Sequence, residues 1–147
     1  MSKRPAKQPG MPWVSSYLTT PDGAKALDFY QRAFGFEKKN VMAGPDGTIM
    51  HAEVAWKDGI VMFGPSNKVE TKTPAQSGVM PPFGIFVYVD DVDALHARAT
   101  AAGAKVVFPL ADQFWGDRTV TLSDPDGYCW TFATNVADFD PSKAPHD

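Results

Sequence analysis

His51 and Glu53 are the two side chains whose types and spacing best suit proton transfer, because they stand two positions apart in a stretch of alternating polarity. In an extended strand this spacing directs both side chains to the same face of a sheet. Three interpretations stay open. Glu53 could be a general base with His51 as its proton partner, the two could be ligands of a displaced metal site, or they could form a hydrogen-bonded polar pair with a structural role. No third metal ligand is evident nearby in the sequence.

An arginine beside aromatic residues is the second feature that could do chemistry. Asp117 and Arg118 follow Phe114 and Trp115. A guanidinium group can hold a carboxylate or a phosphate through a planar pair of hydrogen bonds. The alternative is a structural salt bridge that fixes the loop. The single cysteine, Cys129, has no neighbouring His or Lys that would lower the pKa of its thiol, so a buried unreactive thiol is favoured over a nucleophile.

The elements that carry these residues fall into two similar series. From about residue 13 to residue 63, the apolar pattern predicts a strand, a helix and three further strands. Asp22 is expected to cap the helix and Gly35 to end it. The same order recurs from about residue 84 to residue 136. The predicted strands cover 13–19, 36–42, 48–56, 60–63, 84–89, 105–109, 118–123 and 128–133, and the second helix lies between Asp90 or Asp91 and Gly103.

Landmark residues recur at one spacing, which predicts an internal duplication. The pairs that share this spacing are Asp22 and Asp90, Gly35 and Gly103, and Gly59 and Gly127. The spacing is longer than the roughly 20–50 residues of a solenoid repeat, so it indicates two copies of one supersecondary unit.

The flanking and connecting segments differ in composition from these units. Residues 1–12 and 138–147 are expected to be flexible, with 13–137 forming a single domain. The stretch 64–83 is rich in Pro, Gly, Ser and Thr and links the two predicted units. A connection of this length is either a plain connector or a lid over a binding site.

Composition excludes several classes of function. A net charge of −3 leaves no electrostatic footprint for nucleic acid or for an anionic membrane surface. No apolar run approaches the roughly 20 residues of a membrane-spanning helix, and the start of the chain lacks the apolar stretch of a signal peptide. One cysteine excludes an internal disulfide, which favours a reducing, cytoplasmic setting.

The order of these motifs resembles the vicinal oxygen chelate superfamily, which includes glyoxalase I, extradiol dioxygenases, fosfomycin-resistance enzymes and bleomycin-binding proteins. The pieces that carry the resemblance are Ala26–Phe36, Val89–Ala94, Ala102–Ala104 and the turn Asp124–Gly127. The pieces Ile49–Glu53 and Phe114–Arg118 look more specifically like a branch associated with phosphonate-use operons. The resemblance implies an α+β fold in which two tandem βαβββ units form a curved, cup-shaped mixed sheet with helices outside. It also implies a homodimer.

Metal-using members of that superfamily hold one divalent ion with four side chains, one each from the first and last strands of the two units. Counting from the glycines carries those positions onto Ser15, Phe63, Gly84 and Thr131. None of the four supplies the imidazole or carboxylate that such an ion needs. We therefore expect no metal and no other cofactor. If the predicted position in any of these strands is wrong by one residue, a different side chain occupies it, but the four positions still do not supply a set of metal ligands.

A small-molecule site is the best prediction. Several aromatic and hydroxyl side chains are expected to face the cup and make a largely apolar hole with a few polar groups. The residues predicted to contact the ligand are Trp13, Ser15, Tyr17, His51, Glu53, Phe63, Phe86, Tyr88, Trp115, Arg118 and Thr131. Alternatively, the aromatic side chains pack against one another or across a dimer seam.

The sequence thus predicts a metal-independent, glyoxalase-like and bleomycin-resistance-protein-like module that binds a small organic molecule in an aromatic cup. One alternative is an enzyme, either a metal-dependent lyase or dioxygenase, or an isomerase with Glu53 as its general base. Another is a non-catalytic dimerisation module. His51 and Glu53 are the weak catalytic candidates.

Overall fold

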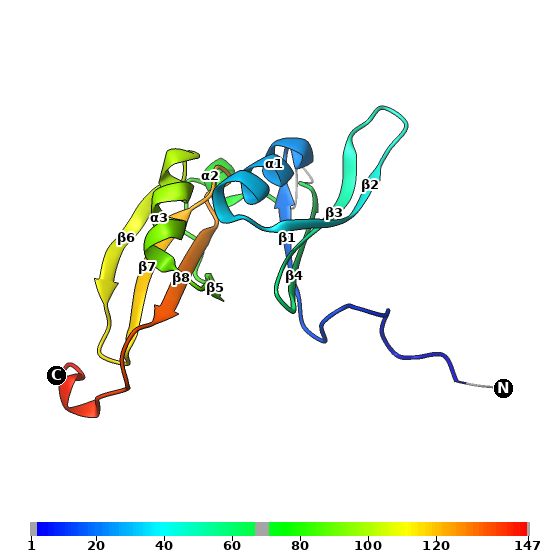
Figure 1. Ribbon diagram of the computed structural model, residues 1–147. Helices are drawn as coiled ribbons and strands as arrows, with labels where there is room; N and C mark the ends of the chain where they lie inside the picture. Colours follow the sequence, from blue (N-terminus) through cyan, green and yellow to red (C-terminus); the bar gives the residue numbers. More distant parts are fainter. Residues whose placement is uncertain (1–2, 67–70, 147) are drawn as a thin grey trace. The chain divides into compact units, whose positions relative to one another are not determined.

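A computed structural model describes residues 3–66 and 71–146 (Figure 1). It divides into two compact units. The first comprises residues up to Gln31 together with Gly35–Thr71, and the second comprises Arg32–Phe34 together with Lys72 onward. In the described part of the chain, no helix is long and apolar enough to cross a membrane.

The first unit has one helix and a mixed four-stranded sheet. Its sheet has the strand order β1-β4-β3-β2, in which β1 and β4 are parallel and the other neighbours are antiparallel. The elements are β1 (Ser16–Thr20), α1 (Gly23–Phe34), β2 (Glu37–Ala43), β3 (Ile49–Trp56) and β4 (Gly59–Pro65).

Side chains on one face of this sheet form the core of the first unit. Asp22 caps α1 by accepting a hydrogen bond from the Lys25 amide, and Gly35 ends the helix in the left-handed conformation. The ring of Tyr30 on α1 packs edge-on against Phe63 of β4, with 5.5 Å between centroids. The opposite face of the sheet is the one that α1 does not cover.

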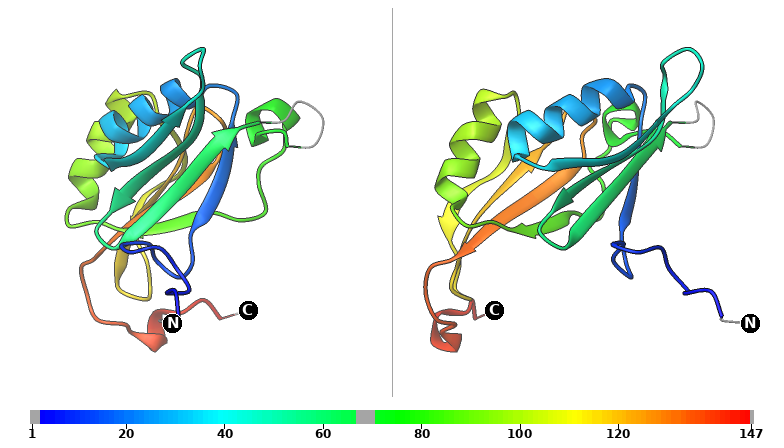
Figure 2. Two further views of the ribbon diagram at one scale, coloured as in Figure 1. Left: turned by 90° about the vertical axis from the view of Figure 1, so that its right-hand side faces the viewer. Right: turned by 45° about the vertical axis from the view of Figure 1, so that its right-hand side comes forward.

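The second unit repeats this order. Its sheet runs β5-β8-β7-β6, again with one parallel pair, β5 and β8. Its elements are α2 (Pro74–Ser77), β5 (Ile85–Tyr88), α3 (Val92–Ala101), β6 (Lys105–Asp112), β7 (Asp117–Ser123), β8 (Cys129–Asn135) and the short 3-10 helix Pro141–Lys143. The helix α3 lies along one face of this sheet (Figure 2).

Aromatic packing dominates the core of the second unit. Phe34 lies 4.7 Å from Phe132 and 5.3 Å from Trp130, measured between ring centroids. Trp130 and Phe132 are both fully buried. The Val92 amide at the start of α3 donates a hydrogen bond to the Thr134 hydroxyl, which ties the helix to β8. Apolar burial and this polar tie together fix which face of the sheet stays open.

The predicted α+β fold with two tandem βαβββ units is confirmed. Two elements were not predicted: α2, which lies in the segment expected to be a linker, and the 3-10 helix in the expected tail. Residues 67–70 of that linker lie outside the described residues. The cue for α2 was the sequence Thr73-Pro74-Ala75-Gln76, in which Thr73 and Gln76 form a capping box.

The segment that contains α2 is fixed to the turn between β7 and β8. The Ala75 amide donates a hydrogen bond to the Asp126 carbonyl at 2.9 Å. Gly127 permits this approach, because a Cβ at that position would lie 2.8 Å from the Ala75 nitrogen. Its φ of +87° also favours glycine.

Replacing Gly127 with alanine should therefore destabilise the second unit more than a conformational penalty alone. Gly103→Ala is the matched control, because Gly103 also has a positive φ, +105°, but a Cβ there would meet nothing within 4 Å. We expect Gly103→Ala to cost about 1 kcal/mol and Gly127→Ala roughly 1–3 kcal/mol more. Chemical denaturation measures both, and equal losses would show that the packing of Pro74 and Ala75 contributes little.

Candidate functional site

On the open face of the first sheet, four polar side chains form a hydrogen-bonded chain. Tyr17 Oη lies 3.4 Å from His51 Nδ1, and His51 Nε2 lies 3.2 Å from Glu53 Oε1. Asn40 Nδ2 donates to Glu53 Oε2 at 3.3 Å. The side chains come from β1, β2 and β3. The prediction that His51 and Glu53 share a strand face is confirmed by their direct contact.

The side chains linked by these hydrogen bonds differ in how far they are exposed to solvent. Tyr17 is 54% exposed, while the side chains of His51 and Glu53 are 27% and 8% exposed. Because both Glu53 oxygens accept hydrogen bonds beneath the surface, the carboxylate supports His51 and is poorly placed to reach a ligand itself. Tyr17 and Asn40 are exposed at this site, and His51 is half-buried.

On the open face of the second sheet, two aromatic side chains donate hydrogen bonds to a buried carboxylate, and a third ring packs against one of them. Tyr88 Oη donates to Asp117 Oδ2 at 2.7 Å, and Trp115 Nε1 donates to the same oxygen at 2.9 Å. Phe86 packs edge-on against Tyr88 with 5.3 Å between centroids. Asn135 Nδ2 donates to Asp117 Oδ1 at 3.0 Å. We call Phe86, Tyr88 and Trp115 the aromatic shelf.

The electrostatics of the shelf follow from this network. Burial alone would raise the pKa of the Asp117 carboxyl, but hydrogen bonds from Asn135, Tyr88 and Trp115 stabilise the charged form, so its pKa is lowered. The hydrogen bond between Tyr88 and Asp117 also raises the pKa of Tyr88, because the carboxylate holds the phenol proton. The rings remain 50% (Phe86), 58% (Tyr88) and 37% (Trp115) exposed. The carboxylate thus fixes the polar edges of two rings and leaves part of each ring accessible.

The other predicted residues take varied positions. Thr131 lies beside Phe86 on the open face, where its hydroxyl shares a 2.7 Å hydrogen bond with that of Thr121. Trp13 is 78% exposed, with the Lys7 ammonium 5.2 Å from its ring. The Ser15 hydroxyl oxygen is buried and has no hydrogen-bond partner among the described residues.

The prediction that Phe63 faces the ligand is wrong, because Phe63 is 1% exposed and packs under α1. The residue that actually aligns with Thr131 is Met62: Met62 pairs with Tyr17, as Thr131 pairs with Phe86. The offset between these equivalent positions is one residue longer than the offset between the glycines. A one-residue slip reverses the face of every side chain in a strand.

For Arg118, the structure shows the salt-bridge alternative. Its Nε lies 2.7 Å from Asp112 and its Nη1 lies 3.0 Å from Asp93. These bonds raise the pKa of Arg118 and lower that of Asp112. The guanidinium therefore links β7 to β6 and to α3. Its N–H groups already donate hydrogen bonds to the carboxylates of Asp112 and Asp93.

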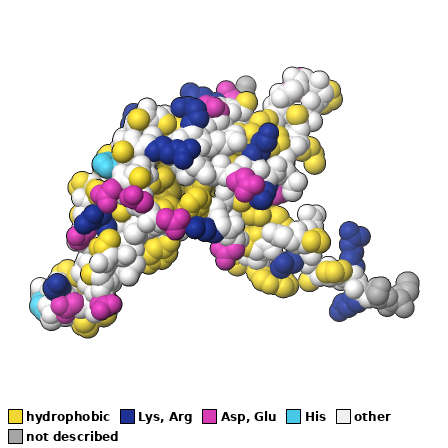
Figure 3. Space-filling model, viewed as in Figure 1, with side chains coloured by type: hydrophobic (Ala, Val, Ile, Leu, Met, Phe, Trp, Pro, Cys, Tyr) yellow, Lys and Arg dark blue, Asp and Glu magenta, His cyan; other side chains and the backbone are white. Residues whose placement is uncertain are grey.

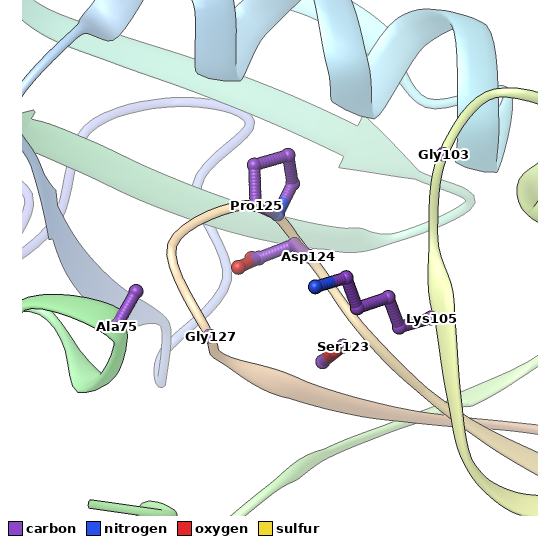
Figure 4. Close-up of a pocket in the computed structure, with 7 residues that line it drawn as sticks. All are labelled: Ala75, Gly103, Lys105, Ser123, Asp124, Pro125 and Gly127. Carbon is purple, nitrogen blue, oxygen red and sulfur yellow. The ribbon is translucent and has the colours of Figure 1, made fainter. Parts of the chain in front are cut away.

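Two cavities lie within the second unit. One, of about 370 Å³, is shown in Figure 4, where Lys105 extends from the start of β6 toward the turn that carries Ser123 and Asp124. The other, of about 310 Å³, is lined partly by Val79, Met80 and Cys129. Neither is lined by the aromatic shelf, and both are near the lower limit of small-molecule pockets. Partial burial raises the pKa of the Cys129 thiol, with a further contribution from the charge of Asp124.

The donor set does not suit the divalent ion that the fold family implies. With the observed register, the four positions carry Ser15, Met62, Gly84 and Thr131. A thioether and two hydroxyls are poor ligands for a hard or borderline ion. Within 3–66 and 71–146, no three His, Cys, Asp or Glu side chains gather closely enough to hold a metal.

Two contributors were missed by sequence reasoning. Asn40 supports Glu53, but it lies within the register shift between Lys38 and Val41, so simple alternation does not locate it. Asp117 was noted only as a neighbour of Arg118, although its ring-anchoring role requires Tyr88, which is 29 positions away. The signal in the sequence was an acidic residue that closely follows the aromatic pair Phe114 and Trp115.

Comparisons with known proteins agree with this fold. A model of the Glyoxalase/Bleomycin resistance protein/Dioxygenase superfamily matches residues 10–132. An uncharacterized protein of Mycobacterium bovis is 37% identical over 129 residues, covering 85% of this chain and 84% of the relative. TioX from Micromonospora sp. ML1 is 34% identical, with a TM-score of 0.68 over 83% of this chain and 97% of that one. TnmS3, an antibiotic binding protein from Streptomyces sp. CB03234, is 26% identical, with a TM-score of 0.62 over 82% and 93%.

The family match covers most of both units, and the solved relatives share their fold. The resemblance inferred from the sequence motifs is confirmed, and the chain belongs to the Glyoxalase/Bleomycin resistance protein/Dioxygenase superfamily.

Proposed function

We propose that this protein binds a small organic molecule with a flat aromatic part, without a metal ion, and that the aromatic shelf supplies the main contact. The observation that carries the proposal is that Asp117 holds the exposed rings of Tyr88 and Trp115 by hydrogen bonds, with the exposed ring of Phe86 packed against Tyr88. Figure 3 shows hydrophobic side chains gathered on the surface over the strands of the second unit. Exposed aromatic rings offer stacking at little entropic cost when hydrogen bonds hold them in place.

The comparisons support binding as the class of function. TnmS3 is described as an antibiotic binding protein, which makes sequestration without catalysis a reasonable role for this chain. We also propose that the protein is a homodimer in the cytoplasm. The single cysteine suits a reducing compartment.

The metal-independent part of the proposal rests on the donor chemistry at Ser15, Met62, Gly84 and Thr131. Protein purified without a chelating tag or resin should contain no stoichiometric divalent ion, and its thermal stability should not change with EDTA. One tightly bound equivalent of metal would contradict this part and favour the lyase or dioxygenase alternative.

The binding part can be tested with a panel of aromatic antibiotics and metabolites screened by thermal shift, because a ligand raises apparent stability by mass action. Phe86→Ala should weaken an identified ligand by about 5- to 30-fold, since stacking on one ring is worth about 1–2 kcal/mol. Phe139→Ala is the matched control, because Phe139 is 59% exposed and lies outside the shelf. Isothermal titration calorimetry measures both affinities.

Equal losses in the two variants would contradict the role of the shelf. If no panel member binds and Phe86→Ala converts a dimer to a monomer, the dimerisation module is the better function. Analytical ultracentrifugation distinguishes these outcomes. An isomerase with Glu53 as its base is disfavoured, because both oxygens of that carboxylate already accept hydrogen bonds.

A further inference from the structure

The donor and the acceptor can be assigned for each hydrogen bond that links the polar side chains in the first unit. Glu53 accepts from Asn40 on one oxygen, so its other oxygen is an acceptor for His51 Nε2. A neutral imidazole carries one proton, and this pairing places that proton on Nε2. His51 Nδ1 is then a hydrogen-bond acceptor, and Tyr17 Oη donates to it.

The contact between Tyr17 Oη and His51 Nδ1 is weak enough for a ligand hydroxyl to take its place. At 3.4 Å it is longer than an ordinary hydrogen bond from a hydroxyl group. Tyr17 reaches this place across Gly64, where a Cβ would lie 2.6 Å from the phenol oxygen. Glycine at that position therefore allows the phenol to lie beside the imidazole.

Apolar side chains flank His51 on the same face. Met42 pairs with His51 across β2 and β3, and Met62 pairs with Glu53 across β3 and β4. Met42 is 64% exposed. Flexible thioether side chains make favourable contacts with aromatic rings. The face thus combines a polarised imidazole, a phenol and an adaptable apolar surface.

We infer that His51 Nδ1 accepts a proton from a weakly acidic hydroxyl of a bound molecule, with phenols and enols as the ligand class. In this step the ligand O–H bond breaks and an Nδ1–H bond forms, which gives a phenolate or enolate next to an imidazolium. The buried Glu53 carboxylate balances the imidazolium charge and holds the ring, so Glu53 is a positioning residue. Tyr17 Oη then donates a hydrogen bond to the ligand oxygen.

This inference goes beyond the proposed binding and does not depend on the aromatic shelf, since all its residues belong to the first unit. It also differs from the sequence-based hypothesis, in which Glu53 was the base. The structure places the carboxylate behind the imidazole, and the imidazole is the more exposed of the two groups.

The tautomer of His51 is the first test, and it needs no ligand. Long-range proton–nitrogen NMR spectra of the labelled protein should show the Nε2–H form for His51. Glu53→Gln should reduce that preference, because an amide can donate to the ring as well as accept from it. A predominant Nδ1–H form in the unmodified protein would overturn the inference. This measurement stands even where a variant fails to fold.

The second test uses 4-nitrophenol as the probe, because its absorbance changes when it loses its proton, and 4-nitroanisole as the matched molecule without a hydroxyl. Binding should increase the phenolate fraction of 4-nitrophenol and shift the His51 nitrogen signals. His51→Asn should weaken 4-nitrophenol roughly tenfold while changing 4-nitroanisole little. Unchanged His51 signals at saturating probe, or equal losses for both molecules, would overturn the inference. Neither result would affect the proposed role of Phe86.

Discussion

Phe132→Ala should lower the free energy of unfolding by about 3–5 kcal/mol, which is a large share of the stability of a domain of this size. Phe132 is fully buried and packs against both Phe34 and Trp130 in the core of the second unit. Truncation removes the transfer free energy of the ring and leaves a cavity beside two large aromatic side chains. Those neighbours cannot collapse to fill it.

Phe86→Ala is the control for this prediction, because it makes the same chemical change on the adjacent strand, where Val87 pairs with Phe132. Phe86 is 50% exposed, so its truncation should cost less than about 1.5 kcal/mol. Urea denaturation followed by circular dichroism gives both values. Comparable losses would mean that the second unit does not have the core described above.

Asp117→Asn should be the next most damaging substitution, with an expected loss of about 2–3 kcal/mol at neutral pH. Asp117 is 2% exposed, and its two oxygens accept hydrogen bonds from Tyr88, Trp115 and Asn135. An amide presents a donor where a carboxylate oxygen now accepts, so at least one buried donor loses its partner. The rings of the shelf should also become more mobile, which should weaken any ligand held there.

The loss should depend on pH in a definite direction. The folded-state pKa of Asp117 is lower than its ordinary value, so its stabilising contribution is present above about pH 4 and disappears as the pH falls through the lowered pKa. The difference in unfolding free energy between wild type and Asp117→Asn should therefore be largest at neutral pH and shrink in acid. Asp112→Asn, at a side chain that is 59% exposed, should show a much smaller effect at neutral pH. A difference that persists undiminished in acid would mean that Asp117 is not stabilised as a carboxylate.

Local sequence patterns were sufficient for most of the fold. Asp22 caps the first helix as expected, and of the two candidates Asp90 and Asp91 it is Asp91 that caps the second, because short polar side chains satisfy the first free amides. The positive φ at Gly35 and Gly103 marks both helix ends. The phosphonate-operon branch remains a prediction.

The candidate site was predicted less completely, because it depends on which strand face is buried. His51 and Glu53 were found from their two-residue spacing, which is a local property. Phe63 was assigned to the wrong face because the glycine spacing differs by one residue from the spacing of the paired strand positions.

By itself, the sequence determined the family, the order of the elements and the presence of a polar pair on an otherwise apolar strand. These follow from caps, turns and period-two alternation, which act over a few residues. Tertiary structure alone decided that Glu53 lies behind His51, that Asp117 anchors Tyr88 and Trp115, and that Arg118 is engaged by Asp112 and Asp93. Each of those relationships joins side chains through strand register, a bulge or a turn, and a single residue of register changes which side chains can meet.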